Sequence, residues 1–104
     1  METCVGRVTH FFSRLSVAAL ALSGPIAIND ILHFCGSRTD FYQKVWSMEV
    51  EHAPIQSAGP GAEIAVKVAE PVRRGDQVFL VTGLTPEERD AILMEQLRDW
   101  QGGA

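Results

Sequence analysis

Basic and aromatic side chains stand close together near the N-terminus, and two neighbouring arginines follow much later in the chain. Guanidinium groups bind phosphates through paired hydrogen bonds and aromatic rings stack on unpaired bases, so this mixture is typical of RNA contact. The alternative interpretation is that Phe11 or Phe12 packs in the interior and the arginines only face solvent. The candidate RNA-binding residues are Arg7, His10, Arg14, Arg73 and Arg74.

The three histidines and the two cysteines are the candidate metal ligands. His10, His33 and His52 show none of the i, i+2 or i, i+4 spacings of local metal ligands. Cys4 and Cys35 form no zinc-binding pattern, and the sequence leaves open whether they form a disulfide. We therefore expect structural or surface histidines, small buried thiols, and neither a metal site nor another cofactor.

Nucleophiles and paired acids occur without the surroundings that catalysis requires. Ser13 and Ser16 lie in no nucleophile-elbow sequence. Glu49 and Glu51 share one face of an extended segment, a spacing that suits glycoside hydrolysis but is more typical of a solvated strand face. The sequence predicts no catalytic residues, and we expect a binding protein rather than an enzyme.

Length, composition and charge exclude several classes of protein. The chain has 104 residues, a formal net charge of −4 and 46% hydrophobic residues, which suffices for one compact domain. These values exclude a disordered tail and a strongly basic nucleic-acid binder. Residues 85–104 carry five acidic and two basic side chains, a net charge of −3, so the preceding part is nearly neutral. No signal-peptide pattern or long apolar run is present, which predicts a cytoplasmic protein without a membrane span.

Six stretches have the alternation or the β-branched residues of strands, and turn residues separate them. Six short strands joined in this way predict an all-β fold, a small closed antiparallel β-barrel, because closure removes exposed sheet edges. In the fourth stretch Lys44 falls on the apolar side, which indicates a bulge or the end of burial there. The expected strands cover residues 4–12, 16–22, 31–35, 41–51, 62–68 and 77–81.

The end of the chain has the signals of one helix. Thr85 can cap the helix and Glu88 completes a capping box, with Pro86 at the first helical position. An apolar stripe then either packs on the barrel or docks on a partner, and packing is favoured because a lone helix of this length is marginal in water. We therefore divide the chain into a barrel over residues 1–84 and a helix and tail over 85–104. The stripe consists of Leu93, Leu97 and Trp100.

Four short motifs, a strand start and three turns, follow one another along the expected barrel. A turn of the Gly-Asp type needs a positive φ angle before its aspartate, and asparagine is the best tolerated substitute for glycine there. We therefore expect positive φ at Asn29 and at Gly75. The motifs are GRV at 6–8, GPIAIND at 24–30, PGAE at 60–63 and RRGD at 73–76.

The order of these motifs resembles that of the β-barrel domain 2 of elongation factor Tu-type translational GTPases, and more closely that of short translation elongation factor-like barrels, over residues 5–82. The chain lacks a glycine-rich phosphate loop, so the resemblance implies a barrel that does not bind GTP. It implies a non-catalytic module of protein biosynthesis that contacts tRNA or rRNA. The alternative is a protein-interaction accessory subunit of a collagenase-like peptidase-family or RNA-modifying enzyme, because similar barrels are appended to that peptidase family.

Overall fold

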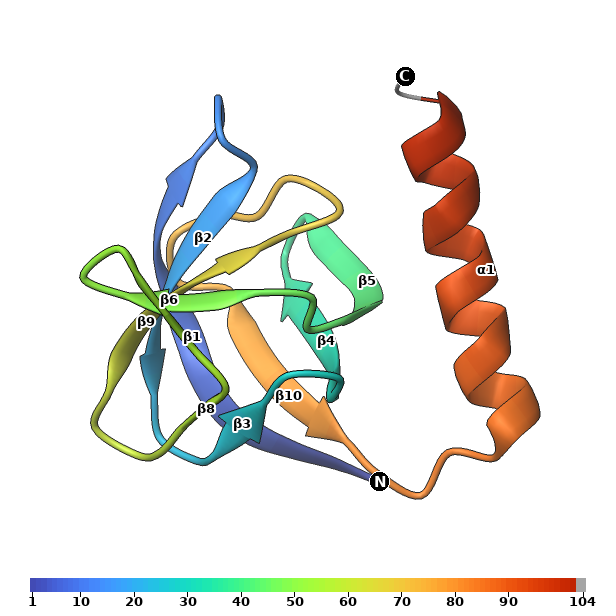
Figure 1. The fold of residues 1–104 in the computed structure, drawn as a ribbon, viewed down its shortest axis with the longest axis horizontal. Helices are drawn as coiled ribbons and strands as arrows, with labels where there is room; N and C mark the ends of the chain where they lie inside the picture. The colour runs from blue at the N-terminus through green and yellow to red at the C-terminus, as the bar shows by residue number, and fades with distance from the viewer. Residues whose placement is uncertain (103–104) are drawn as a thin grey trace.

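The computed structural model describes residues 1–102, with side chains as far as Glu95. Within this range eight strands form one antiparallel sheet in the order β5-β4-β10-β1-β2-β9-β6-β7, and β3 and β8 form a separate pair (Figure 1). The helix α1 (Pro86–Gly102) follows the last strand. The strands are β1 (Glu2–Phe12), β2 (Val17–Leu22), β3 (Ile26–Ala27), β4 (Ile31–Gly36), β5 (Thr39–Lys44), β6 (Met48–Val50), β7 (Ala53–Ile55), β8 (Ser57–Ala58), β9 (Glu63–Lys67) and β10 (Gln77–Val81).

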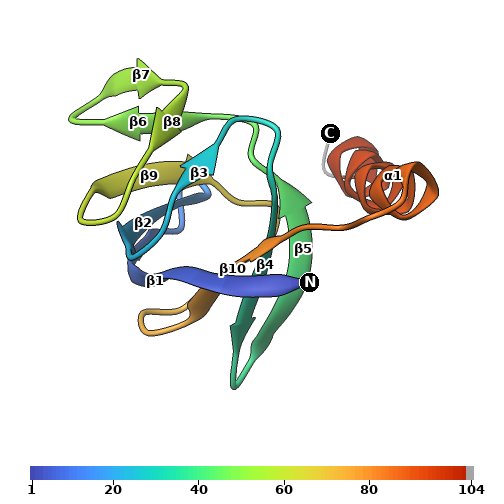
Figure 2. The same ribbon diagram turned by 90° about the horizontal axis from the view of Figure 1, so that it is seen from below.

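The sheet is strongly curved around one apolar core (Figure 2). Every second residue of β2 is buried, as the alternation of a strand with one inward face requires. In β1 the register shifts between Cys4 and Gly6 and again between Val8 and His10, and such bulges bend a strand. The expected all-β fold is therefore confirmed, and five of the six expected strands correspond to β1, β2, β4, β9 and β10.

The expected closed barrel is wrong, and so is the single strand expected over residues 41–51. β5 pairs with β4 and ends at Lys44, whereas β6 begins at Met48 and pairs with β9. These two ladders lie towards opposite ends of the sheet order. The break between β5 and β6 therefore leaves a gap in the hydrogen bonding of the sheet, named here the seam, which a continuous strand would have closed. Val45 and Met48 are both buried although they are three residues apart, which a regular strand with alternating faces does not allow.

A buried glutamine side chain bridges this seam. Gln43 on β5 is 0% exposed. Its Nε2 donates to the carbonyl of Lys67 at 2.8 Å, and its Oε1 accepts from the N–H of Ala69 at 2.8 Å. Because Lys67 is the last residue of β9, a side chain joins two strands that belong to distant parts of the sheet.

The two aspartate turns share one hydrogen-bond arrangement. In each, the carboxylate accepts from the backbone N–H three residues earlier at 2.8 Å, and the N–H of the aspartate donates to the carbonyl of that same residue. The aspartates are Asp30 and Asp76. The residues before them have positive φ, 80° at Asn29 and 93° at Gly75, so the expected turn geometry is confirmed.

Asp76 also fixes the β4–β5 hairpin. Its carboxylate is buried and accepts a short hydrogen bond from the hydroxyl of Thr39, the first residue of β5. Gly36 ends β4 against the same carboxylate, where any Cβ atom would overlap it. The turn before β10 and the hairpin between β4 and β5 are therefore locked together.

The helix begins with the expected capping box. The N–H of Glu88 donates to the hydroxyl of Thr85 at 3.1 Å, and the N–H of Thr85 donates to the carboxylate of Glu88 at 2.9 Å. Arg89 then donates to the backbone carbonyl of Asn29. Among the residues that the structure describes, no helix is both long enough and apolar enough to cross a membrane.

The helix lies beside the β4–β5 part of the sheet and contacts β5 (Figure 2). Leu93 of the predicted stripe is half-buried. The side chains of Leu97 and Trp100 lie outside the described residues. The position of the helix agrees with packing on the sheet, and the role of the complete stripe stays a prediction.

Candidate functional site

The predicted basic residues lie in two places, and the first is the middle of β1. Arg7 is exposed there beside the turn of residues 73–76, which contains the arginine pair. This turn is held against β1 because the N–H of Val8 donates to the carbonyl of Asp76, and the carbonyl of Val8 accepts from the N–H of Gly75, both at 2.8 Å. The structure therefore brings three of the five predicted side chains to one region.

The second place is the tip of the β1–β2 hairpin. His10 is exposed, and its ring lies 4.4 Å from the ring of Phe12, while Arg14 is exposed in the turn. Phe11 packs against the core, whereas Phe12 is 45% exposed and Leu15 is 64% exposed. Phe11 therefore belongs to the core, whereas Phe12 faces solvent. Residues 12–16, named here the hairpin tip, present apolar surface.

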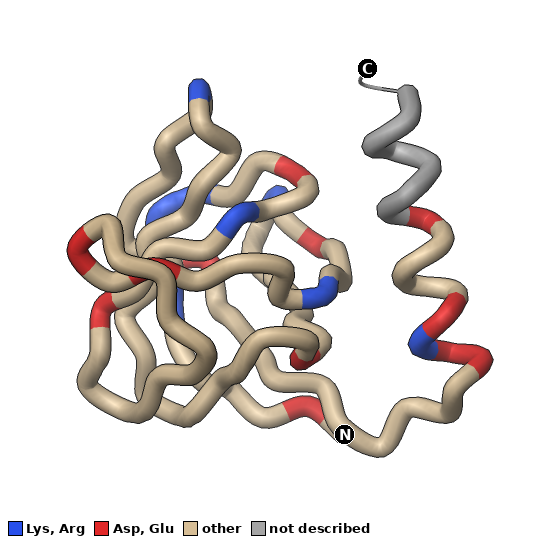
Figure 3. The backbone as a smooth tube through the Cα atoms, in the orientation of Figure 1, with Lys and Arg blue, Asp and Glu red and all other residues tan. Residues whose placement is uncertain are grey.

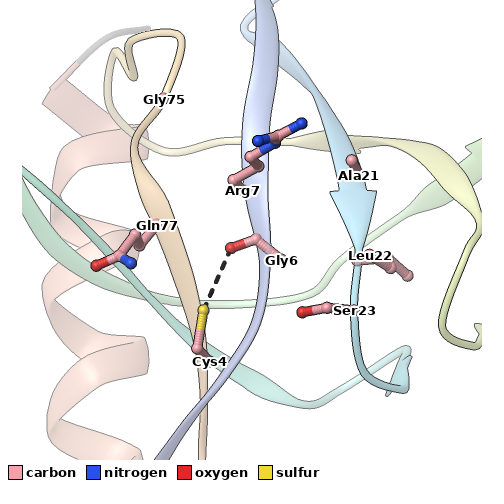
Figure 4. A pocket seen from close by; sticks show the side chains of 8 residues that line it. All are labelled: Cys4, Gly6, Arg7, Ala21, Leu22, Ser23, Gly75 and Gln77. Atoms are coloured by element: carbon pink, nitrogen blue, oxygen red, sulfur yellow. Dashed lines mark hydrogen bonds between the residues drawn. The ribbon is translucent and has the colours of Figure 1, made fainter.

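An open hollow of about 440 Å³ lies between β1, β2 and β10 (Figure 4). Arg7 supplies the only charged side chain of its lining, and the Cys4 thiol points to the carbonyl of Gly6 at 3.7 Å. In Figure 4 the side chains of Arg7 and Gln77 extend away from each other, so the polar groups do not converge on one point. The hollow is lined by Cys4, Gly6, Arg7, Ala21, Leu22, Ser23, Gly75 and Gln77.

The closest group of titratable side chains is elsewhere, on the outer face of β1, β4 and β5. His33 Nδ1 lies 2.6 Å from an oxygen of Glu2, and Nε2 lies 2.6 Å from an oxygen of Asp40. The hydroxyl of Tyr42 donates to the second oxygen of Glu2 at 2.8 Å, and the tyrosine ring stacks on the imidazole at 4.1 Å. These four residues are named here the His33 cluster.

The cluster shifts the pKa values of its members in a consistent way. Burial lowers the pKa of His33, but hydrogen bonds to Glu2 and Asp40 together raise it above its ordinary value. The hydrogen bond from His33 lowers the pKa of Glu2 against the opposing effect of desolvation. The hydrogen bond to Glu2 and partial burial raise the pKa of Tyr42 to about 12. The two hydrogen bonds therefore favour the cationic form of the imidazole, which lies between two carboxylates.

This arrangement suits charge pairing better than proton transfer. Both ring nitrogens of His33 face carboxylate oxygens, so neither nitrogen is placed to take a proton from the nearby Cys35 thiol. The two carboxylates approach the ring from opposite edges, and the described residues contain no group of three side chains suited to a metal ion. Cys4 and Cys35 are free thiols, on strands that β10 separates.

The sequence alone does not reveal the His33 cluster, although it contains part of the signal. The turn GSRTD between two expected strands predicts a hairpin, and in that hairpin His33 lies opposite Tyr42. Asp40 lies on the same outward face as Tyr42. No local pattern points to Glu2, which comes from a strand more than thirty positions earlier.

Comparison with known proteins gives two curated relatives, while no protein-family model matches the chain. The chain is 33% identical over 78 residues to an uncharacterized protease of Methanocaldococcus jannaschii. It is 34% identical over 80 residues to a collagenase of Porphyromonas gingivalis. These alignments cover 74% and 75% of this chain but only 19% and 22% of the relatives. The chain therefore spans about a fifth of the length of the curated relatives that it matches.

Comparison with solved structures points to the same kind of protein. The chain is similar to the C-terminal domain of a Geobacillus thermoleovorans protein named as a U32 peptidase, with a TM-score of 0.71 and 17% identity. The similarity covers 75% of this chain and 91% of that domain. The selenomethionine variant of the same domain gives a TM-score of 0.70 over 96% of its length. The chain thus shares the fold of that domain over nearly the whole length of the domain.

These findings contradict the expected relationship to elongation factor-like proteins. The relatives and the similar structures point to U32 peptidase and collagenase-type proteins, so the assignment to translation and protein biosynthesis is wrong, while the RNA-binding residues stay a prediction. The error has a physical cause. Three of the four motifs that suggested it contain turns, and two of these turns close on an aspartate through purely local hydrogen bonds. Such turns report backbone geometry and do not distinguish one family from another.

Proposed function

We propose that this chain is a non-catalytic accessory domain of a collagenase-like, U32-type enzyme and that it acts through contacts with protein. The observation that carries the proposal is the match to 91% of a C-terminal domain from a protein named as a U32 peptidase. Identities of 33% and 34% to a protease and a collagenase support it independently of the fold. In this proposal the chemistry belongs to the remaining part of the enzyme.

The hairpin tip is the part of the surface best suited to such a contact. Phe12 and Leu15 expose large apolar side chains at the end of a projecting hairpin (Figure 1), and Arg14 lies between them in sequence. Interfaces gain most of their affinity from a few aromatic, arginine and apolar anchors that become fully buried. In the proposed complex these side chains are covered by the catalytic part of the enzyme.

A domain exchange tests the proposal directly. The segment of the Porphyromonas gingivalis collagenase that aligns with this chain is replaced by residues 1–84, and a second protein receives a flexible linker of equal length instead. We expect the exchanged protein to keep most of the collagenase activity that the linker protein loses. Equal activity of the two replacement proteins would refute the accessory role.

The proposed contact is tested in the same exchanged protein. Phe12→Ala combined with Leu15→Ala should lower its activity or its thermal stability, because truncation of a buried anchor typically costs more than about 1 kcal/mol. The matched control is Ser37→Ala with Arg38→Ala, which alters the exposed tip of the β4–β5 hairpin. Equal effects of the two pairs would show that the hairpin tip makes no special contact.

A further inference from the structure

The His33 cluster has a hydrogen-bonding requirement that only a protonated ring can meet. An ionised carboxylate accepts hydrogen bonds and has none to donate. Both ring nitrogens lie 2.6 Å from carboxylate oxygens, one of Glu2 and one of Asp40, so both nitrogens must carry a proton. A neutral imidazole carries only one N–H and would direct a lone pair at the other carboxylate.

We propose that the His33 cluster is a pH-operated latch that fastens the start of β1, and with it the connection to α1, while His33 is cationic. This inference goes beyond the proposed accessory role and does not depend on it. Glu2 is the second residue of the chain, and its two carboxylate oxygens reach His33 on β4 and Tyr42 on β5. The latch therefore spans three strands.

The start of β1 is in turn bonded to the segment that leads into the helix. The N-terminal amine of Met1 donates to the carbonyl of Thr82 at 2.8 Å, and the N–H of Thr82 donates to the carbonyl of Met1 at 2.8 Å. Figure 1 shows the N-terminus next to the loop that connects β10 to α1. When Glu2 no longer binds His33, the two hydrogen bonds between Met1 and Thr82 are no longer stabilised by the contact of the adjacent residue.

The charged groups that the neighbouring strands place around the His33 ring are carboxylates, and these stabilise its protonated form. β1 contributes Glu2 and β5 contributes Asp40, while Tyr42 on β5, whose pKa is raised to about 12, is neutral at physiological pH, and Cys35 on β4 supplies a thiol. The main causes of the shift in the pKa of His33 include no charged side chain from the described part of α1. β10 presents the uncharged ring of Phe79, whose centre is 6.2 Å from the imidazole.

The direction of the pH effect follows from the two shifted groups. A raised pKa means that His33 stabilises the closed latch fully below its ordinary value of 6.5, and this contribution is lost as pH rises through the folded-state pKa. A lowered pKa means that Glu2 contributes fully above 4.5, and its contribution is lost as pH falls through its folded-state pKa. The latch is strongest between these two values.

Hydrogen exchange at the Thr82 amide measures the latch, because that N–H is bonded to Met1. After correction for the intrinsic effect of pH, we expect opening to increase about twofold to fivefold from about pH 6 to about pH 9, as for ion pairs that solvent partly screens. His33→Gln should remove this pH dependence. The control is His10→Gln, which alters an exposed histidine of β1 outside the His33 cluster and should leave the pH dependence unchanged.

A second measurement does not depend on the folding of the His33→Gln variant. The NMR titration midpoint of His33 should lie above 6.5 in the native chain and should fall in both Glu2→Gln and Asp40→Asn. A native midpoint at the ordinary value would overturn the proposal, as would a midpoint that neither variant changes. Thr82 exchange that lacks the pH dependence, or that keeps it in His33→Gln, would overturn it equally.

Discussion

Replacement of Gln43 by methionine tests whether a side chain holds the seam of the sheet together. Methionine is similar in length and flexibility but offers the neighbouring backbone neither a donor nor a strong acceptor. In the variant the carbonyl of Lys67 and the N–H of Ala69 lose their 2.8 Å hydrogen bonds to Gln43 in a buried place. The carbonyl of Lys44 loses a longer hydrogen bond of 3.1 Å. We therefore expect folding to persist with reduced stability.

The magnitude follows from the number of groups left without partners. Each buried donor or acceptor that loses its partner costs about 1–3 kcal/mol, and burial of a more apolar side chain offsets part of this. For two groups we expect a net loss of about 2–4 kcal/mol, a large fraction of the roughly 5–15 kcal/mol typical of a domain. With the urea dependence usual for small proteins, the unfolding midpoint should fall by about 1–2 M.

Urea unfolding followed by tryptophan fluorescence measures this loss. The control is Gln77→Met, at an exposed position of β10, where we expect a change within about 0.5 kcal/mol. A Gln43→Met midpoint equal to that of the control, with an unchanged slope, would refute the argument that the glutamine joins the two sides of the seam.

Three further predictions concern single positions. Gly36→Ala should cost about 1–3 kcal/mol because its Cβ overlaps a buried and hydrogen-bonded carboxylate, whereas Gly59→Ala, with open space around it, should be neutral in the same urea assay. At φ 80°, Asn29→Ala should lower stability by about 1 kcal/mol while Asn29→Gly leaves it nearly unchanged, and equal values would contradict the strain argument. Tyr42 is the only tyrosine, so near-ultraviolet absorbance should detect its phenolate only near pH 12, and Glu2→Gln should lower that midpoint. An unchanged midpoint would show that Glu2 does not hold the hydroxyl.

Features that depend on neighbouring residues were predictable from the sequence. The capping box of Thr85 and Glu88 formed as expected, since its hydrogen bonds join residues three positions apart. The positive φ angles at Asn29 and Gly75 also formed, because the aspartate that follows each residue closes its turn locally. The interruption near Lys44 was visible as a break in alternation, although the strand ends there while burial continues at Val45.

Features that depend on distant partners were not predictable. The change of facing between Val45 and Met48 serves two ladders with different partner strands, and no alternation pattern contains that information. In the sequence Gln43 is an ordinary polar residue, because its hydrogen-bond partners Lys67 and Ala69 follow 24 and 26 positions later. The His33 cluster was missed for the same reason, because Glu2 joins it from another strand.

The seam between β5 and β6 also has a consequence for the order of folding. The β4–β5 and β6–β9 ladders are far apart in the sheet, but only residues 45–47 separate them along the chain. The entropic cost of closing a loop grows with its length. Once one of these ladders has formed, the strand of the other ladder, β5 or β6, is therefore held only three residues away along the chain. The slow step is then the approach of β10 and β9 to β1 and β2, which requires closing loops of many residues. We therefore expect residues 45–47, which connect β5 to β6, to take their final conformation late in folding and at little entropic cost.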